Sequence, residues 1–180
     1  NRTIAGFGLA DCPGHPTWLK PAETLLDAAE DELHLISGQP DTRLHSQNDR
    51  GSEAQSDKIA GREPASLHPE TARKHGLAPG DVVRIWNRRG ACLAGLRLDP
   101  LIRRDCIALA TGAWFDPQTV DGMPLEVHGN PNVLTLDKGC SELSQGNCAH
   151  TTLVRIARWD GPPPSLSVDR PPAVTAAQAT

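Results

Sequence analysis

Short apolar runs separated by turn residues make up most of the chain up to residue 160. Runs of this length bounded by Gly, Pro, Asn or Asp are typical of β-strands. The last of them alternates well, with Val154 and Ile156 on one side and Arg155 on the other. The runs that predict strands are residues 33–37, 82–87, 91–98, 106–111, 133–136 and 152–159. A mainly β domain of about six strands with short helices between them predicts a closed or nearly closed β-barrel with helical inserts.

Helical patterns are confined to two short segments. Residues 21–32 begin with a proline and carry a short apolar stripe, so they predict a helix. Residues 67–76 have a proline near the start and a glycine at the end, which favours a helix of one or two turns. Residues 1–20 contain too many Gly and Pro residues for a regular element, and residues 41–63 form a long polar stretch. A loop of that length in a compact domain is usually functional or disordered.

The composition changes sharply near the C-terminus. Glycine and proline number 16 each in the whole chain, an excess that fits many turns. From Gly161 onward the sequence is rich in proline and poor in large apolar side chains. We therefore divide the chain into one domain over residues 1–160 and a disordered, Pro-rich tail over residues 161–180.

Charge and motif patterns exclude several function classes. The net charge of −4 argues against a nucleic-acid partner, because phosphate backbones attract a cationic surface. There is no apolar run long enough to predict insertion into a membrane. The five cysteines include no CxxC pair and the histidines show no metal-ligand spacing, so no metal site is predicted. There is also no P-loop, no GxSxG and no HExxH, and we assign no catalytic residue to this chain.

Three polar clusters remain as candidates for binding. Residues 37–47 offer a cation, hydroxyls and amides directly after a strand, a set that can bind phosphate and sugar oxygens, although a solvated loop explains it equally well. Residues 111–117 place Trp114 beside Phe115 at a strand end, where they either line a cavity or belong to the core. Residues 128–135 contain two asparagines around a proline, which suit purine recognition or simply a turn.

Taken in order, these clusters resemble the C-terminal cofactor-binding domain of molybdopterin-dependent oxidoreductases of the dimethyl sulfoxide reductase family. Within it, the chain is most similar to the biotin sulfoxide and trimethylamine N-oxide reductases. The resemblance covers residues 1–160. It is carried by five blocks, DCPGHPTWLKP (11–21), LHLISGQPDTRLHSQ (33–47), KIAGREPASLHPETARKHGLAPGDVVRIWNRRGACLAG (58–95), ATGAWFDP (110–117) and HGNPNVLTLDKG (128–139).

The resemblance implies a six-stranded double-psi β-barrel with short helical inserts, of the aspartate decarboxylase-like kind. It also implies a cofactor, a bis-molybdopterin guanine dinucleotide with molybdenum, held mainly by upstream domains that this chain lacks and capped by this domain. The positions that match cofactor contacts are Gln39, Thr42, Arg43, Leu44, His45, Ser46, Asn130, Asn132 and His150. His150 departs from the family pattern, where glutamine is common. For Arg43, in a polar loop, burial for packing is not expected.

The resemblance implies a part of a larger enzyme that reduces an S-oxide or an N-oxide, and the isolated chain is expected to be inactive and monomeric. Its expected partners are the upstream domains of the parent enzyme. The chain begins with Asn1 rather than Met, so we read the native N-terminus as missing. Cytoplasmic location is favoured by scattered cysteines, with the periplasm as the alternative. Two other interpretations stay open: a free-standing β-barrel interaction module without cofactor, and the same domain from a nitrate reductase or formate dehydrogenase.

Overall fold

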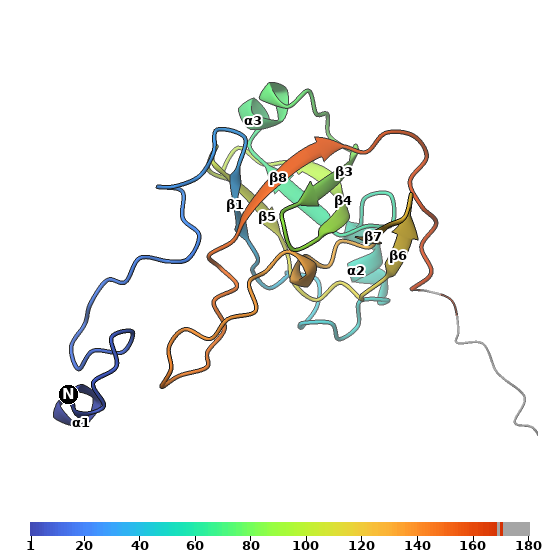
Figure 1. Cartoon of the computed structure of the whole chain (residues 1–180). Helices are drawn as coiled ribbons and strands as arrows, with labels where there is room; N and C mark the ends of the chain where they lie inside the picture. The colour runs from blue at the N-terminus through green and yellow to red at the C-terminus, as the bar shows by residue number, and fades with distance from the viewer. Residues whose placement is uncertain (169, 171–180) are drawn as a thin grey trace, which may run out of the picture.

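A closed six-stranded β-barrel forms the centre of the computed structural model, which describes residues 1–168 and residue 170 (Figure 1). The barrel strands are β1 (Leu33–Ile36), β2 (Pro64–Leu67), β3 (Val82–Trp86), β4 (Ala91–Leu98), β5 (Cys106–Leu109) and β8 (Leu153–Arg158). They follow the order β2-β5-β1-β8-β3-β4, and the pairing of β4 with β2 closes the circle. The predicted fold class, a mainly β chain with a six-stranded double-psi barrel, is confirmed.

Local and long-range pairings both contribute to the barrel. Strands β3 and β4 form an antiparallel hairpin in which Ile85 lies opposite Cys92. Closure is parallel instead, with Pro64 of β2 opposite Gly95 of β4. Strand β1 likewise runs parallel to β5. Parallel pairs need long crossover connections. The long connection between β1 and β5 carries the polar cluster of residues 37–47, whereas the clusters at 111–117 and 128–135 lie after β5 and before β8.

The barrel interior is filled by aliphatic side chains from all six strands. Leu35, Leu67, Ile85, Leu96 and Ile107 are fully buried. They interdigitate with smaller Ala and Cys residues, as a narrow barrel requires. The interior is therefore packed, and binding surfaces have to lie on the loops outside it.

Several sequence-based predictions of local structure are wrong. Residues 21–32 form turns rather than a helix, and residues 133–136 form no strand but follow a short 3₁₀ helix, η1 (Pro131–Val133). Strand β2 was not predicted, and in the barrel it lies between β5 and β4. The helix predicted at 67–76 is present as α3 (Pro69–Lys74). Two further short helices, α1 (Arg2–Gly6) and α2 (Ser52–Asp57), lie in segments predicted to be loops.

A hairpin outside the barrel supports the C-terminal segment. Strands β6 (Pro117–Val120) and β7 (Met123–Glu126) pair with each other, and β7 pairs with β4 outside the closed ring, where Glu126 lies opposite Cys92. Asp116, buried just before β6, accepts hydrogen bonds from the backbone N–H groups of Ser167 (2.6 Å) and Val168 (3.0 Å). The first part of the segment predicted to be a disordered tail therefore contacts the barrel. Residues 169 and 171–180 of that tail lie outside the described residues, and the division at residue 160 stays a prediction.

Among the described residues, no helix has both the length and the apolar character needed to cross a lipid bilayer.

Candidate functional site

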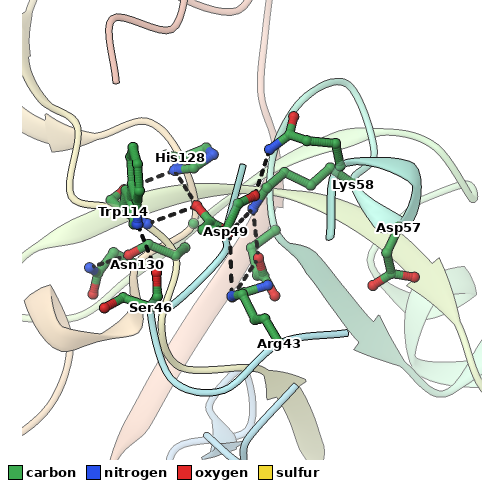
Figure 2. A network of polar contacts seen from close by, with 12 residues as sticks. Arg43, Ser46, Asp49, Asp57, Lys58, Trp114, His128 and Asn130 are labelled. Atoms are coloured by element: carbon green, nitrogen blue, oxygen red, sulfur yellow. Dashed lines mark hydrogen bonds and ion pairs between the residues drawn. The ribbon is translucent and has the colours of Figure 1, made fainter. Parts of the chain in front are cut away.

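Four charged side chains are buried together beneath the polar loop of residues 39–47 (Figure 2). Lys58 Nζ lies 2.9 Å from both Asp49 Oδ1 and Glu63 Oε2. Arg43 lies 3.3 Å from the same Asp49 oxygen through Nε and 3.0 Å from Glu63 Oε2 through Nη2. All four side chains are no more than 2% exposed. We call these residues the ion cluster.

The ion cluster balances two positive against two negative charges. Burial alone would raise the pKa of the Asp49 carboxyl, but the hydrogen bond from Lys58, the charges of Lys58 and Arg43 and the N–H of Trp114 hold that pKa below its usual range. A buried charge is tolerated only when it is paired and hydrogen-bonded. Because Lys58 and Arg43 each contact both carboxylates, removing either cation leaves Asp49 and Glu63 to share a single positive charge.

The position of Arg43 differs from the sequence-based expectation. Its guanidinium is buried and also donates to the carbonyl oxygens of His45 (3.2 Å) and Thr111 (3.1 Å). The expectation that burial is improbable in a polar loop was wrong, because Asp49 and Glu63 draw the side chain inward. Arg43 therefore joins the 39–47 loop to the barrel, and whether it also contacts a ligand stays a prediction.

The loop is fixed against the end of β5 by close backbone contact. Gly112 has φ +93°, and a Cβ atom there would collide with the carbonyl group of His45. Trp114 Nε1 donates to the carbonyl oxygen of Ser46 at 2.9 Å. Within the loop, Gln39 Oε1 accepts from the backbone N–H of His45 (3.2 Å), and Gln39 Nε2 lies 2.9 Å from His45 Nδ1. These contacts hold the His45 and Ser46 positions in one conformation.

A buried carboxylate organises the neighbouring loop of residues 128–132. Glu126 accepts hydrogen bonds from the backbone N–H groups of His128, Gly129 and Asn130, at 3.0, 2.7 and 2.7 Å. Burial raises the pKa of Glu126 even though these bonds act to lower it. Asn130 in turn uses its side chain internally, donating to the carbonyl of Ala113 (2.8 Å) and accepting from the N–H of Asn132 (3.0 Å). Asn130 thus positions Asn132 rather than presenting its own amide.

His128 connects the 128–132 loop to the ion cluster. Its Nδ1 lies 2.8 Å from the carbonyl oxygen of Trp114, so Nδ1 carries the proton, and it lies 3.9 Å from Asp49 Oδ2 (Figure 2). Burial and the nearby charge of Lys58 lower the pKa of His128, against the opposing effects of the Trp114 carbonyl and Asp49. The imidazole is therefore neutral at physiological pH.

Two adjoining cavities open over these loops. The first, of about 390 Å³, is lined by the 45–46 loop, the 111–115 segment, Asn130 and Asn132. Trp114 and Phe115 are exposed there, so they line the cavity and are not part of the core. The second, of about 510 Å³, lies between Asn132 and the segment of residues 135–147. Asn132 is exposed and borders both cavities, which makes it the most central of the predicted residues.

The nine predicted site residues are only partly brought together. His45, Ser46, Asn130 and Asn132 line the first cavity. Gln39 and Thr42 line a separate cavity of about 350 Å³. Leu44 is exposed, and His150 is exposed away from the lining of all three cavities.

Sequence reasoning missed the residues that hold this surface in place. These are Asp49, Lys58, Glu63, Glu126 and His128. Each lies in or beside a loop, so no periodicity marks it as buried. One available signal was the presence of charged residues at both ends of the long 41–63 stretch, where a buried charge would require a partner.

Comparison with known proteins identifies the family to which the chain belongs. The model of the molydopterin dinucleotide binding domain matches residues 33–153. The chain belongs to this family. Biotin sulfoxide reductase of Cereibacter sphaeroides is 49% identical over 159 residues, which cover 88% of this chain and 21% of that protein. Dimethyl sulfoxide/trimethylamine N-oxide reductase of the same organism is 38% identical over 170 residues, covering 93% of this chain and 21% of that protein.

One more sequence relative and one solved structure are also similar to the chain. Trimethylamine-N-oxide reductase 1 of Escherichia coli K12 is 41% identical over 167 residues, covering 89% of this chain and 20% of that protein. Acetylene hydratase from Pelobacter acetylenicus has a TM-score of 0.63 at 20% sequence identity, over 80% of this chain and 21% of that one, which shows the fold alone. The chain thus spans about a fifth of the length of the relatives it matches. The predicted cofactor class, a molybdopterin dinucleotide, is confirmed by the family.

The donors around the two cavities fit a dinucleotide. Asn132 offers an amide that can meet the polar edge of a purine, and Lys138 offers a cation for a phosphate group. Gln145 and Asn147 also line this cavity, but Gln145 Nε2 already donates to the carbonyl oxygen of Ser141 and Asn147 Oδ1 already accepts from the N–H of Ala149. His45 and Ser46 add an imidazole and a hydroxyl, and Trp114 with Phe115 adds an aromatic wall. Neutral donors with few charges and adjacent apolar surface are the usual lining of a cofactor site.

Proposed function

We propose that this domain closes over a bis-molybdopterin guanine dinucleotide carrying molybdenum, in an enzyme that reduces an S-oxide or an N-oxide. The observation that carries the proposal is the 49% identity to a biotin sulfoxide reductase over most of the chain. The two other sequence relatives compared above, from Cereibacter sphaeroides and Escherichia coli, are also named for S-oxide and N-oxide reduction. When bound, the cofactor supplies the two-electron chemistry of the reaction.

In this proposal the chain binds and orients the cofactor and excludes water, and the reacting groups lie elsewhere. Asn132 and the 135–147 segment contact one dinucleotide half of the cofactor, and His45 and Ser46 contact the adjacent part of the cofactor. The ion cluster and Glu126 act from below by fixing both loops before the cofactor arrives. A preformed site binds more tightly because no loop-ordering cost is subtracted from the binding free energy.

The remaining assignments follow from the same proposal. The partner is the rest of the parent enzyme, and the isolated chain is a monomer without reductase activity. We place the enzyme in the cytoplasm, a proposal supported by five cysteines that are all free thiols. Fractionation of cells that express the parent protein would test the location, since a periplasmic pool would contradict it.

The experiment is to purify the parent enzyme and measure oxidation of a reduced dye with biotin sulfoxide, dimethyl sulfoxide and trimethylamine N-oxide. We expect turnover with at least one of these oxides, together with molybdenum and guanine nucleotide in the same preparation. The 180-residue chain alone should give no turnover. A parent protein that contains neither molybdenum nor guanine nucleotide would overturn the proposal.

A further inference from the structure

The first 32 residues of the chain contain no buried residue. The first buried side chain is Leu33, at the start of β1. The segment is nevertheless not polar throughout. Its exposed large apolar side chains include Phe7 (55% exposed), Trp18 (70%) and Leu19 (45%). We call residues 1–20 the arm.

The arm has a defined conformation that it cannot owe to the barrel. Helix α1 is five residues long, has no buried residue and extends well away from the barrel (Figure 1). Isolated helices shorter than about 12–15 residues are marginal in water, because one turn costs more entropy than its hydrogen bonds return. The contacts that support α1 are within the arm: the Asn1 side chain caps the helix by accepting from the backbone N–H groups of Thr3 and Ile4.

A second segment, the turn at residues 139–147, contacts the arm. Residues 139 and 147 form an isolated antiparallel bridge, and the turn between them extends on the same side of the barrel as the arm (Figure 1). The backbone N–H of Glu142 donates to Asp11 Oδ2 at 2.9 Å, which ties the two together. Leu143, next to that contact, is 43% exposed. The arm and the 139–147 turn thus form one projecting surface with four exposed large apolar side chains.

We infer that this projecting surface, the arm together with the 139–147 turn, is the docking surface for the remainder of the parent polypeptide, with Trp18 as its central anchor. The inference rests on the proposed function. About four fifths of the length of the curated relatives lies outside the part that this chain matches, and under the proposed function the corresponding part of the parent enzyme is the covalently linked partner. A linked partner is present at high effective concentration, and a surface of modest area is then sufficient.

The identity of the side chains supports an interface. Single exposed apolar residues are common on any protein, but several on a segment that buries nothing mark an interaction site. Tryptophan is enriched among the residues that dominate binding, because its large flat side chain loses little conformational entropy. A second copy of this chain is the competing occupant, and its presence is measurable.

The test compares hydrogen exchange in the intact parent enzyme and in the isolated 180-residue chain. We expect amides of the arm to exchange at least about tenfold more slowly in the parent, since docking removes their local opening. Exchange in the 139–147 turn is not used as a readout, because residues of this turn also line the second cavity and the cofactor would protect them too. The barrel strands should differ little between the two samples. Equal, fast exchange of the arm in both samples would overturn the inference.

Matched variants locate the anchor. Trp18→Ala in the parent should reduce the arm's protection severalfold, whereas Leu101→Ala, at a site that is 90% exposed after β4, should leave it unchanged. Sedimentation of the isolated chain should give a monomer. A dimer that Trp18→Ala dissociates would assign the surface to a second copy and reject our inference. Molybdenum and guanine nucleotide content of the same parent sample tests the proposed function separately, so the two can fail independently.

Discussion

Replacing Lys58 with methionine tests whether the ion cluster holds the domain together. Lys58 lies 2.9 Å from Asp49 and from Glu63, with all three side chains at most 2% exposed. The variant leaves two buried carboxylates with Arg43 as their only partner in the cluster. Removing one partner of a buried pair costs about 3–5 kcal/mol, because the remaining charge stays desolvated and uncompensated. For a chain of this size, that lowers Tm by roughly 6–20 °C.

The assay is thermal and urea unfolding of the 180-residue chain, followed by circular dichroism. The control is Lys74→Met, which removes an exposed ion pair with Glu30 and should cost less than about 1 kcal/mol. The double variant Lys58→Met/Glu63→Gln restores neutrality in the cluster. We expect it to recover part of the loss, with a coupling of about 0.5–3 kcal/mol. If Lys58→Met costs no more than Lys74→Met, the cluster does not stabilise the domain as argued.

Three further perturbations separate the roles of the loops. Glu126→Ala should destabilise the chain by about 2–4 kcal/mol, because it leaves several buried N–H groups without an acceptor, and urea unfolding measures the loss. His128→Gln should reduce acid sensitivity: the folded pKa of His128 is lowered, so the unfolded chain binds more protons below about pH 6.5 and stability falls as the pH drops. Melts at pH 7.5 and 5.5 should therefore show a smaller difference in the variant, and an unchanged difference would contradict this account. Truncation after Asp160 should cost about 1–3 kcal/mol, since Asp116 loses its hydrogen bonds from Ser167 and Val168; an unchanged melt would mean that water replaces them fully.

The strands predicted from the sequence are those whose pairing is local or whose apolar run is unbroken. The hairpin of β3 and β4 follows from two apolar runs around a short turn. Strand β2 was missed because its partners, β4 and β5, lie far along the chain and its four residues include a proline and a serine. The apolar run at residues 133–136 was, by contrast, wrongly predicted to be a strand. Leu134 is buried there, but the preceding Pro131 starts a 3₁₀ turn.

The predicted helix at 21–32 fails for a related reason. None of its residues is buried: in its apolar stripe Leu25 is only half-buried and Leu26 is exposed, so the stripe has little surface to pack against. Most helical stability in proteins comes from packing of an apolar face, so periodicity without a partner does not produce a helix.

The sequence predicted which loops form the candidate site, but it did not predict the buried residues that hold these loops in place. The polar clusters at 37–47 and 128–135 indicated the loops that form the cavities, and Asn132 lies where these cavities meet. The inward turn of Arg43 depends on carboxylates at positions 49 and 63, which come near it only in the folded barrel. Charge pairing between loops leaves no periodic signal in a sequence. The family resemblance identified candidate cofactor contacts in this chain, but it did not identify the buried charged residues that fix the loops carrying them.

Cofactor occupancy of the parent enzyme carrying Asn132→Ala tests the central claim most directly. Asn132 is exposed, borders both cavities and has a small side chain, so its truncation should leave the melt of the isolated chain within about 0.5 kcal/mol, as for other surface substitutions. Thr119→Ala, exposed on β6 and outside both cavities, is the control. At limiting cofactor we expect guanine nucleotide and molybdenum per polypeptide to fall severalfold for Asn132→Ala and to stay unchanged for the control. Full occupancy in both variants would contradict a cofactor-binding role for this surface.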